Sequence, residues 1–233
     1  MTALNATEKK DKINLLPIYH GSDKIIKKPE YGKGAVNNDY GLGFYCTKNF
    51  GLGGEWAVSK TKESGYINQY MYNPVGLREL ELDKCPVETW IAVLMNNRRG
   101  RNSPAAFRRR TQFLEKFLID ISEYDIITGW RADDSFFTFV EDFMVGDITR
   151  EELIKSLKIG DLGIQICLKS EKSFREQHIE WVKFHQAPVD KYYPLYLARD
   201  RKARNDYQKL LRESDGKGIR VTDMLKGDYH VGI

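Results

Sequence analysis

The chain has 233 residues, of which 41% are hydrophobic, and a formal net charge of +4. This composition supports one packed core and excludes a globally disordered protein. No apolar run reaches the roughly 20 residues that span a bilayer, and the start MTALNATEKKDK lacks the apolar region of a secretory signal. The three cysteines are widely separated, unlike those of a disulfide framework or a zinc site. We therefore expect a cytoplasmic protein that binds no membrane and no metal.

Periodicity and local signals divide the chain into short elements. Alternating or aromatic and β-branched runs predict strands, and wider apolar spacing predicts helices. In chain order, the predicted elements are strands at 15–22 and 40–47, a helix at 55–60, strands at 66–72 and 77–83, helices at 86–98 and 105–121, a strand at 124–130, helices at 135–145 and 150–158, and strands at 163–168 and 178–185. Pro86 suits the first position of its helix, and Thr149 with Glu152 forms a capping box for another.

Strands scattered among helices without a regular βα rhythm predict an α+β domain over residues 15–188. A polar lead-in, residues 1–14, precedes it. From residue 189 to residue 233 the composition becomes basic and rich in tyrosine. This extension either packs on the domain or waits for a partner.

Two glycine-rich segments contain the G-x-G of nucleotide-binding loops, GLGFY at 41–45 and GLGGEW at 51–56. A dinucleotide fingerprint needs a preceding strand, a helix that opens at the third glycine and an acidic residue about 20 positions later. The first segment leads into a strand, so it does not fit. The second leads into a helix whose start offers an anion site, but we expect it to be a plain flexible connection.

Three separated segments carry polar groups suited to a nucleotide. His20 ends a strand, where an imidazole can bond a ribose hydroxyl, and Gly21 leaves its backbone open to a flat amide. The ring of Tyr45 offers a stacking face. Gln165 is a lone polar side chain in a buried run, where it needs hydrogen-bond partners. Taken singly, each is more typical of an ordinary strand end, a core tyrosine or a glutamine bonded to neighbouring backbone.

Taken together, these segments resemble a known family. The motifs are, in order, His-Gly-Ser at 20–22, DYGLGFYCT at 39–47, Ala-Asp-Asp at 132–134 and a late strand with Gln165. They resemble bacterial toxin-like ADP-ribosyltransferases of the branch that includes poly-ADP-ribose polymerases and diphtheria toxin, over residues 15–184. The resemblance implies two small mixed or antiparallel sheets with flanking helices that form an NAD cleft. It also implies an origin in toxin–antitoxin or phage-defence operons.

The resemblance assigns roles to these residues, with NAD as a substrate. His20 would bond the adenosine-side ribose, the Gly21 main chain would bind the nicotinamide carboxamide with help from Ser22, and Tyr45 would stack on the nicotinamide ring. Gln165 would bond the nicotinamide ribose, at a place where the branch usually has a glutamate. A glutamine supplies neither negative charge nor a general base.

Either the acceptor needs little deprotonation or a carboxylate comes from elsewhere in the chain. Asp133 and Asp134, at the end of a predicted strand, are our candidates for the catalytic acid. A helix cap in a surface turn explains them equally well. Glu176 or Glu180 would take the role if the strand register differs.

The acceptor is predicted from charge. Arginines gather in one segment, and those we assign to nucleic-acid binding are Arg98, Arg99, Arg101, Arg108 and Arg109. A solvated helix face is the structural alternative. We expect mono-ADP-ribosylation of nucleic acid, RNA ahead of DNA, at a base, by a toxin that an antitoxin protein neutralises. The alternatives are a protein acceptor, an NAD glycohydrolase, and a non-catalytic nucleic-acid-binding module on a degenerate transferase fold.

Overall fold

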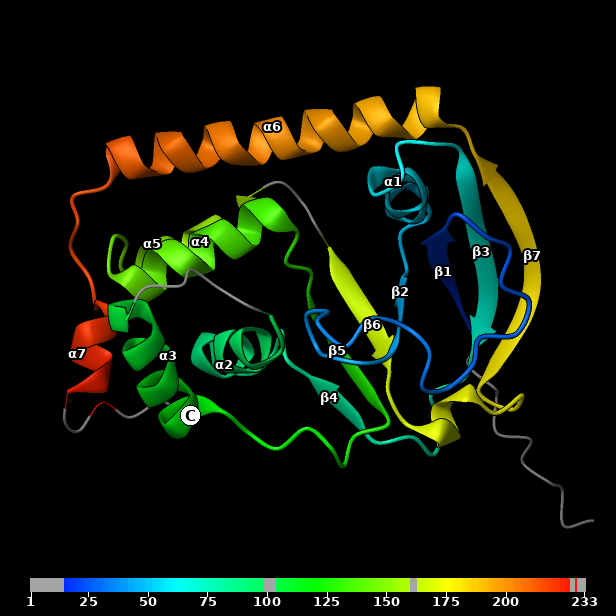
Figure 1. The fold of residues 1–233 in the computed structure, drawn as a ribbon, viewed down its shortest axis with the longest axis horizontal. Helices are drawn as coiled ribbons and strands as arrows, with labels where there is room; N and C mark the ends of the chain where they lie inside the picture. The colour runs from blue at the N-terminus through cyan, green and yellow to red at the C-terminus, as the bar shows by residue number, and fades with distance from the viewer. Residues whose placement is uncertain (1–14, 99–103, 160–162, 227–228, 230–233) are drawn as a thin grey trace, which may run out of the picture.

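A computed structural model describes residues 15–98, 104–159, 163–226 and 229 (Figure 1). Its strands are β1 (Leu16–Ser22), β2 (Phe44–Thr47), β3 (Gly65–Tyr72), β4 (Glu79–Glu81), β5 (Ile126–Trp130), β6 (Ile164–Leu168) and β7 (Ile179–Ala187). Its α-helices are α1 (Phe50–Ser59), α2 (Val87–Asn97), α3 (Pro104–Phe117), α4 (Asp134–Val145), α5 (Arg150–Ser156), α6 (Val189–Glu213) and α7 (Val221–Leu225). The α+β class predicted from the sequence is confirmed.

The strands form one mixed sheet in the order β4-β5-β6-β2-β1-β3-β7, and only β4 and β5 run parallel. The prediction of two small sheets is therefore wrong. The sheet is nevertheless narrow in the middle, because β1 and β2 share a single register pair, Tyr19 with Thr47. The four strands on one side and the three on the other are otherwise paired among themselves. This narrow junction lies beside the cleft described below.

Several elements begin or end where local signals place them. Thr149 and Glu152 form the predicted capping box of α5. Pro86 is the N-cap of α2 rather than its first residue, so the helix begins one residue later than predicted. The strand predicted at 40–47 starts only at Phe44, because Gly41 adopts a φ of 78° and turns the chain before the strand begins. That positive φ favours glycine, which has no Cβ.

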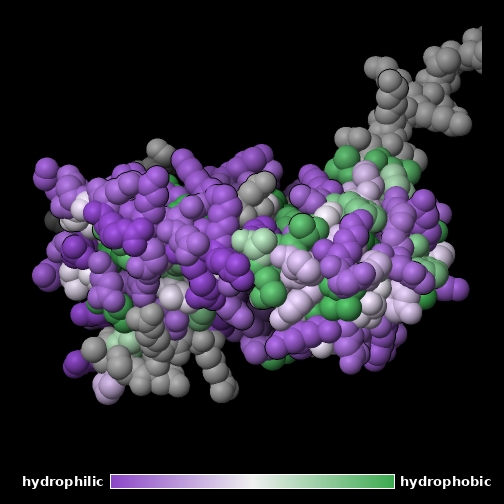
Figure 2. All heavy atoms as spheres, turned by 90° about the horizontal axis from the view of Figure 1, so that it is seen from above, coloured by the Kyte–Doolittle hydropathy of each residue, from purple (hydrophilic) through white to green (hydrophobic). Residues whose placement is uncertain are grey.

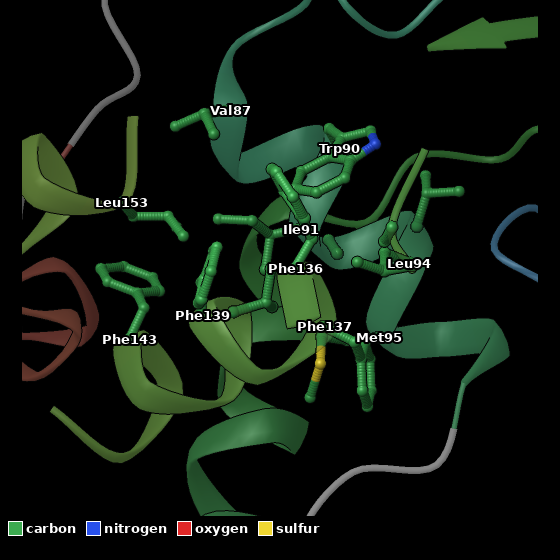
Figure 3. Close-up of a cluster of buried hydrophobic side chains, with 14 of the residues drawn as sticks. Val87, Trp90, Ile91, Leu94, Met95, Phe136, Phe137, Phe139, Phe143 and Leu153 are labelled. Atoms are coloured by element: carbon green, nitrogen blue, oxygen red, sulfur yellow. The ribbon is translucent and has the colours of Figure 1, made fainter. Parts of the chain in front are cut away.

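The helical half of the molecule holds the largest hydrophobic cluster, in which α2 and α4 face each other (Figure 3). Trp90 and Ile91 of α2 and Phe136 and Phe143 of α4 are fully or almost fully buried. Aromatic side chains at helical spacing on α4 supply most of its buried face. This core fixes the start of α4, where the predicted Asp133–Asp134 pair lies.

The extension after residue 188 forms α6, a long helix that crosses above α1 and the helical half (Figure 1). Its Tyr192 ring packs against Gly54 of α1, so closely that a Cβ on that glycine would lie 2.2 Å from the ring. Viewed from the α6 side, the end of the molecule near α7 is hydrophilic, and hydrophobic residues gather towards β7 (Figure 2). Exposed Leu195 and Phe184 belong to α6 and β7, respectively. No helix in the described part of the chain is long and apolar enough to cross a membrane.

Candidate functional site

A cleft of about 1210 Å³ opens beside the narrow junction of the sheet. Its walls come from the ends of β1 and β2, the loop that follows β1, the C-terminal part of α1, the turn at 131–134 and one residue of α6. His20, Tyr45 and Gln165 all line it. They lie on β1, β2 and β6, which are neighbours in the sheet. Segments far apart in the sequence therefore meet at one place.

His20 is held in one tautomer. Its Nδ1 lies 2.6 Å from the carbonyl oxygen of Tyr45, and a carbonyl only accepts, so Nδ1 carries the proton. The ring stacks on Phe44 with 4.2 Å between centroids. Burial lowers the pKa of His20, although the bond to Tyr45 opposes the shift. The imidazole is therefore neutral at pH 7, and its Nε2 is an acceptor with no hydrogen-bond partner among the described residues.

Gly21 lines the cleft, but it has a second structural reason to be glycine. A Cβ there would lie 2.1 Å from the carbonyl oxygen of Gly53 and 2.6 Å from the backbone nitrogen of Ala57. Helix α1 therefore crosses β1 too closely for any side chain. Gly53 itself lies inside α1, so the expectation that this glycine-rich segment forms a flexible connection is wrong. Ser22 lies outside the cleft, and its hydroxyl donates to Asp23.

Tyr45 is fixed through its hydroxyl, which donates to the carbonyl of Gly41 at 2.7 Å and accepts from the backbone nitrogen of Tyr40 at 2.9 Å. Burial raises the pKa of the phenol, so it stays protonated. The hydroxyl is thus used by the fold, and the ring is held rigidly where it lines the cleft. A fixed aromatic ring is suited to stacking.

Gln165 is only 4% exposed and donates through Nε2 to Asp39 Oδ2 at 2.7 Å and to the carbonyl of Trp130 at 3.4 Å. Both neighbours are acceptors, so the amide nitrogen must face them and Oε1 must point the other way. Asp39 also lines the cleft. The sequence motif contained Asp39, but its role was missed.

Asp39 joins three parts of the site. Its Oδ2 also accepts from the backbone nitrogen of Ala132 at 3.0 Å, and its Oδ1 lies 3.1 Å from Nη1 of Arg98. Burial raises the pKa of Asp39, and the Arg98 charge and the hydrogen bonds oppose that rise. Both carboxylate oxygens are thereby engaged. The signal for this role was a lone Asp before a glycine turn, which sequence alone does not separate from an ordinary turn residue.

The two predicted carboxylates differ in their surroundings. Asp133 caps α4 by accepting from the backbone nitrogen of Phe136, and its Oδ2 lies 3.7 Å from Arg199. The side chain of Asp134 is 84% exposed at the cleft and lies 3.2 Å from Arg98. Neither of the reserve candidates, at positions 176 and 180, lines the cleft.

The three predicted nucleic-acid arginines that the structure describes are not brought together. Arg98 lines the cleft and is paired with Asp39 and Asp134. Arg109 donates to the carbonyl of Val145 at 2.6 Å and so binds the end of α4. Arg108 is exposed on α3, away from the cleft lining. The two remaining candidates, Arg99 and Arg101, lie outside the described residues.

The cleft is nevertheless positively charged. Its cationic lining residues are five lysines and two arginines, namely Lys24, Lys27, Lys28, Lys33, Lys60, Arg98 and Arg131. Its acidic ones are Glu30, Asp39, Asp133 and Asp134. Most of the lysines belong to the loop that follows β1, where they are exposed. The excess of positive charge favours an anionic ligand.

Fold and cleft together define an α+β protein with one mixed sheet and a basic cleft of ligand size. The chain belongs to the family described as protein of unknown function DUF3990, whose model matches residues 16–180. No curated protein and no solved structure matched the chain.

Proposed function

We propose that the protein is an NAD-dependent mono-ADP-ribosyltransferase that modifies a nucleic acid, RNA ahead of DNA. In this reaction the bond between C1′ of the ribose and nicotinamide breaks, and nicotinamide leaves as a neutral base. A bond then forms between C1′ and a nitrogen of the acceptor base, which gives its proton to solvent or to a nearby carboxylate. The observation that carries the proposal is the meeting of His20, Tyr45 and Gln165 on one cleft wall.

The protonation and hydrogen bonding of His20, Tyr45 and Gln165 support the roles that the resemblance implies for them. Neutral His20 presents an acceptor nitrogen, which matches the hydroxyl of a ribose. Tyr45 presents a ring whose position is fixed by two hydrogen bonds. Gln165 directs Oε1 away from Asp39, where it can accept from a second ribose hydroxyl. The cleft volume exceeds the 300–1,000 Å³ or so of ordinary ligand pockets, which leaves room for part of an acceptor.

Two residues then share the roles of the glutamate that this chain lacks. Asp39 is a positioning residue, because it holds the Gln165 amide and both its oxygens already accept hydrogen bonds. Asp134 is the carboxylate at the open rim, so it is our choice for accepting the proton of the acceptor. Asp133 serves the fold as the cap of α4.

The acceptor is assigned from the cleft rather than from the arginine segment. Exposed lysines on the loop after β1 line the cleft, where they can contact phosphates of a single strand. A toxin of this kind would need a protein that neutralises it, so the proposal includes an antitoxin partner.

The test uses NAD labelled in its adenylate phosphate, the purified full chain and a bacterial lysate. We expect label in nuclease-sensitive material, and a loss of about 100-fold or more in His20→Ala. His185→Ala is the matched control, because it is the same substitution on β7, outside the cleft. Thermal melts of both variants verify that they are folded.

Other products would point to the alternatives. Label in protease-sensitive material would favour a protein acceptor, and free ADP-ribose without labelled macromolecule would favour a glycohydrolase. Salt-dependent RNA binding with no NAD turnover would favour a non-catalytic module. Equal activity of wild type and a folded His20→Ala would contradict the proposed site.

A further inference from the structure

Arg131, which directly follows β5, is a cleft residue without a hydrogen-bonding partner. Its side chain lines the cleft, yet no guanidinium nitrogen donates to any described residue, and Nη1 is buried and unpaired. Burial lowers the pKa of Arg131, and nearby Asp133 opposes the shift. Leaving buried donors of a charged group unpaired is costly. Such a group is suited to a ligand that supplies the missing acceptors.

The carboxylates near Arg131 are engaged elsewhere. Asp39 bonds Arg98 and Gln165, and Asp133 caps α4. Glu55 of α1 bonds Arg199 through that residue's Nε and Nη2. Arg131 is therefore the one cation of this group, among the described residues, that lacks both an ion pair and a hydrogen bond.

Helix α1 supplies two further groups on the same side. Arg131 Cζ lies over the ring of Trp56, 5.0 Å from the ring centroid. The indole nitrogen of Trp56 is also buried without a partner. Lys60 follows Trp56 by one helical turn, and both line the cleft. Arg131, Trp56 and Lys60 thus all line the cleft, and the first two are in direct contact.

We propose that Arg131, Trp56 and Lys60 form a binding subsite for a phosphate group of a nucleotide ligand. A planar guanidinium recognises phosphate through paired hydrogen bonds, and Lys60 adds a second positive charge. The phosphate belongs either to a small nucleotide with a pyrophosphate or to the backbone of an RNA strand. The subsite requires no turnover of NAD, so it goes beyond the proposed transfer reaction.

The test is a calorimetric titration of the full chain with inorganic pyrophosphate. Arg131→Met keeps the length of the side chain and removes the charge, and Arg131→Lys keeps the charge without the fork. We expect affinity to fall at least about tenfold in Arg131→Met and by less in Arg131→Lys. Arg201→Met, an identical change on the exposed face of α6, is the control and leaves affinity unchanged.

Thermal melting separates binding from a structural role. Because the Arg131 side chain makes no hydrogen bond to any described residue, Arg131→Met melts at or above the temperature of wild type. Repeating the titration with ADP-ribose and with a short single-stranded RNA identifies the source of the phosphate. The ligand whose binding is lost in Arg131→Met is the one that uses the subsite. Equal pyrophosphate affinity in wild type and Arg131→Met, or a melting temperature lowered by many degrees, overturns the inference.

The phosphate subsite and the transferase activity can each be absent without the other. If pyrophosphate binding depends on Arg131 but NAD yields no labelled product, the subsite stands and the transferase proposal fails. If transfer occurs and Arg131→Met binds pyrophosphate and transfers ADP-ribose as wild type does, only the subsite is wrong.

Discussion

Replacing Asp39 by Asn tests whether this carboxylate holds the site together. The side chain is 10% exposed and accepts from Arg98, from the backbone nitrogen of Ala132 and from Gln165. An Asn has nearly the same shape, but its NH2 group would have to face one of these hydrogen-bond donors. Removing one partner of a buried charge pair costs about 3–5 kcal/mol. Water reaches Arg98, whose side chain is 20% exposed, and the buried carboxylate carries a desolvation cost of its own.

These offsets reduce the expected loss for Asp39→Asn to about 2–4 kcal/mol of unfolding free energy. In a chain of this size that lowers the melting temperature by about 4–15 °C. The assay is urea and thermal denaturation followed by circular dichroism. Asp134→Asn is the control, because Asp134 also pairs with Arg98 but is exposed, and it should change stability by less than about 1 kcal/mol. An Asp39→Asn variant that melts within about one degree of wild type would refute the reasoning.

Three further predictions follow from the same geometry. Gly21→Ala places a Cβ 2.1 Å from the Gly53 carbonyl oxygen, so urea unfolding should show a loss of about 3 kcal/mol, and an unchanged midpoint contradicts the close approach. Burial lowers the pKa of His20, so below about pH 6.5 the unfolded chain binds a proton more readily than the folded chain does. The stability of wild type relative to His20→Ala should therefore fall from pH 7 to pH 5. A difference independent of pH would be inconsistent with a buried neutral imidazole. Replacing Lys24 and Lys28 by Gln should reduce the salt dependence of RNA binding by about 1.4 in the log–log slope, whereas an unchanged slope places RNA elsewhere.

Local signals in the sequence predicted most elements. The capping box at Thr149 depends on residues three positions apart, and the alternation before His20 depends on one strand. Such patterns are readable without knowing the fold. The predicted cleft wall of His20, Tyr45 and Gln165 came from the resemblance, since each residue alone is typical of ordinary structure.

Features that depend on distant contacts were missed. Gly21 has no side chain because α1 passes over it, and a long loop and strand β2 separate the helix from β1 in the sequence. Asp39 bonds groups on the C-cap of α2, on β6 and on the turn after β5, and none of these partners is close to it in sequence. The single sheet depends on one register pair between β1 and β2. Contacts between residues that are far apart in the sequence decide all three features. A single sequence does not show which of these residues will meet.

The most direct test of the account is the release of nicotinamide from NAD by the purified full chain, measured by chromatography with and without RNA. We predict release that depends on RNA, that equals the ADP-ribose found on the RNA, and that is lost in a folded His20→Ala variant. No release of nicotinamide, or equal release by wild type and His20→Ala, would contradict the assignment of this cleft to ADP-ribosyl transfer.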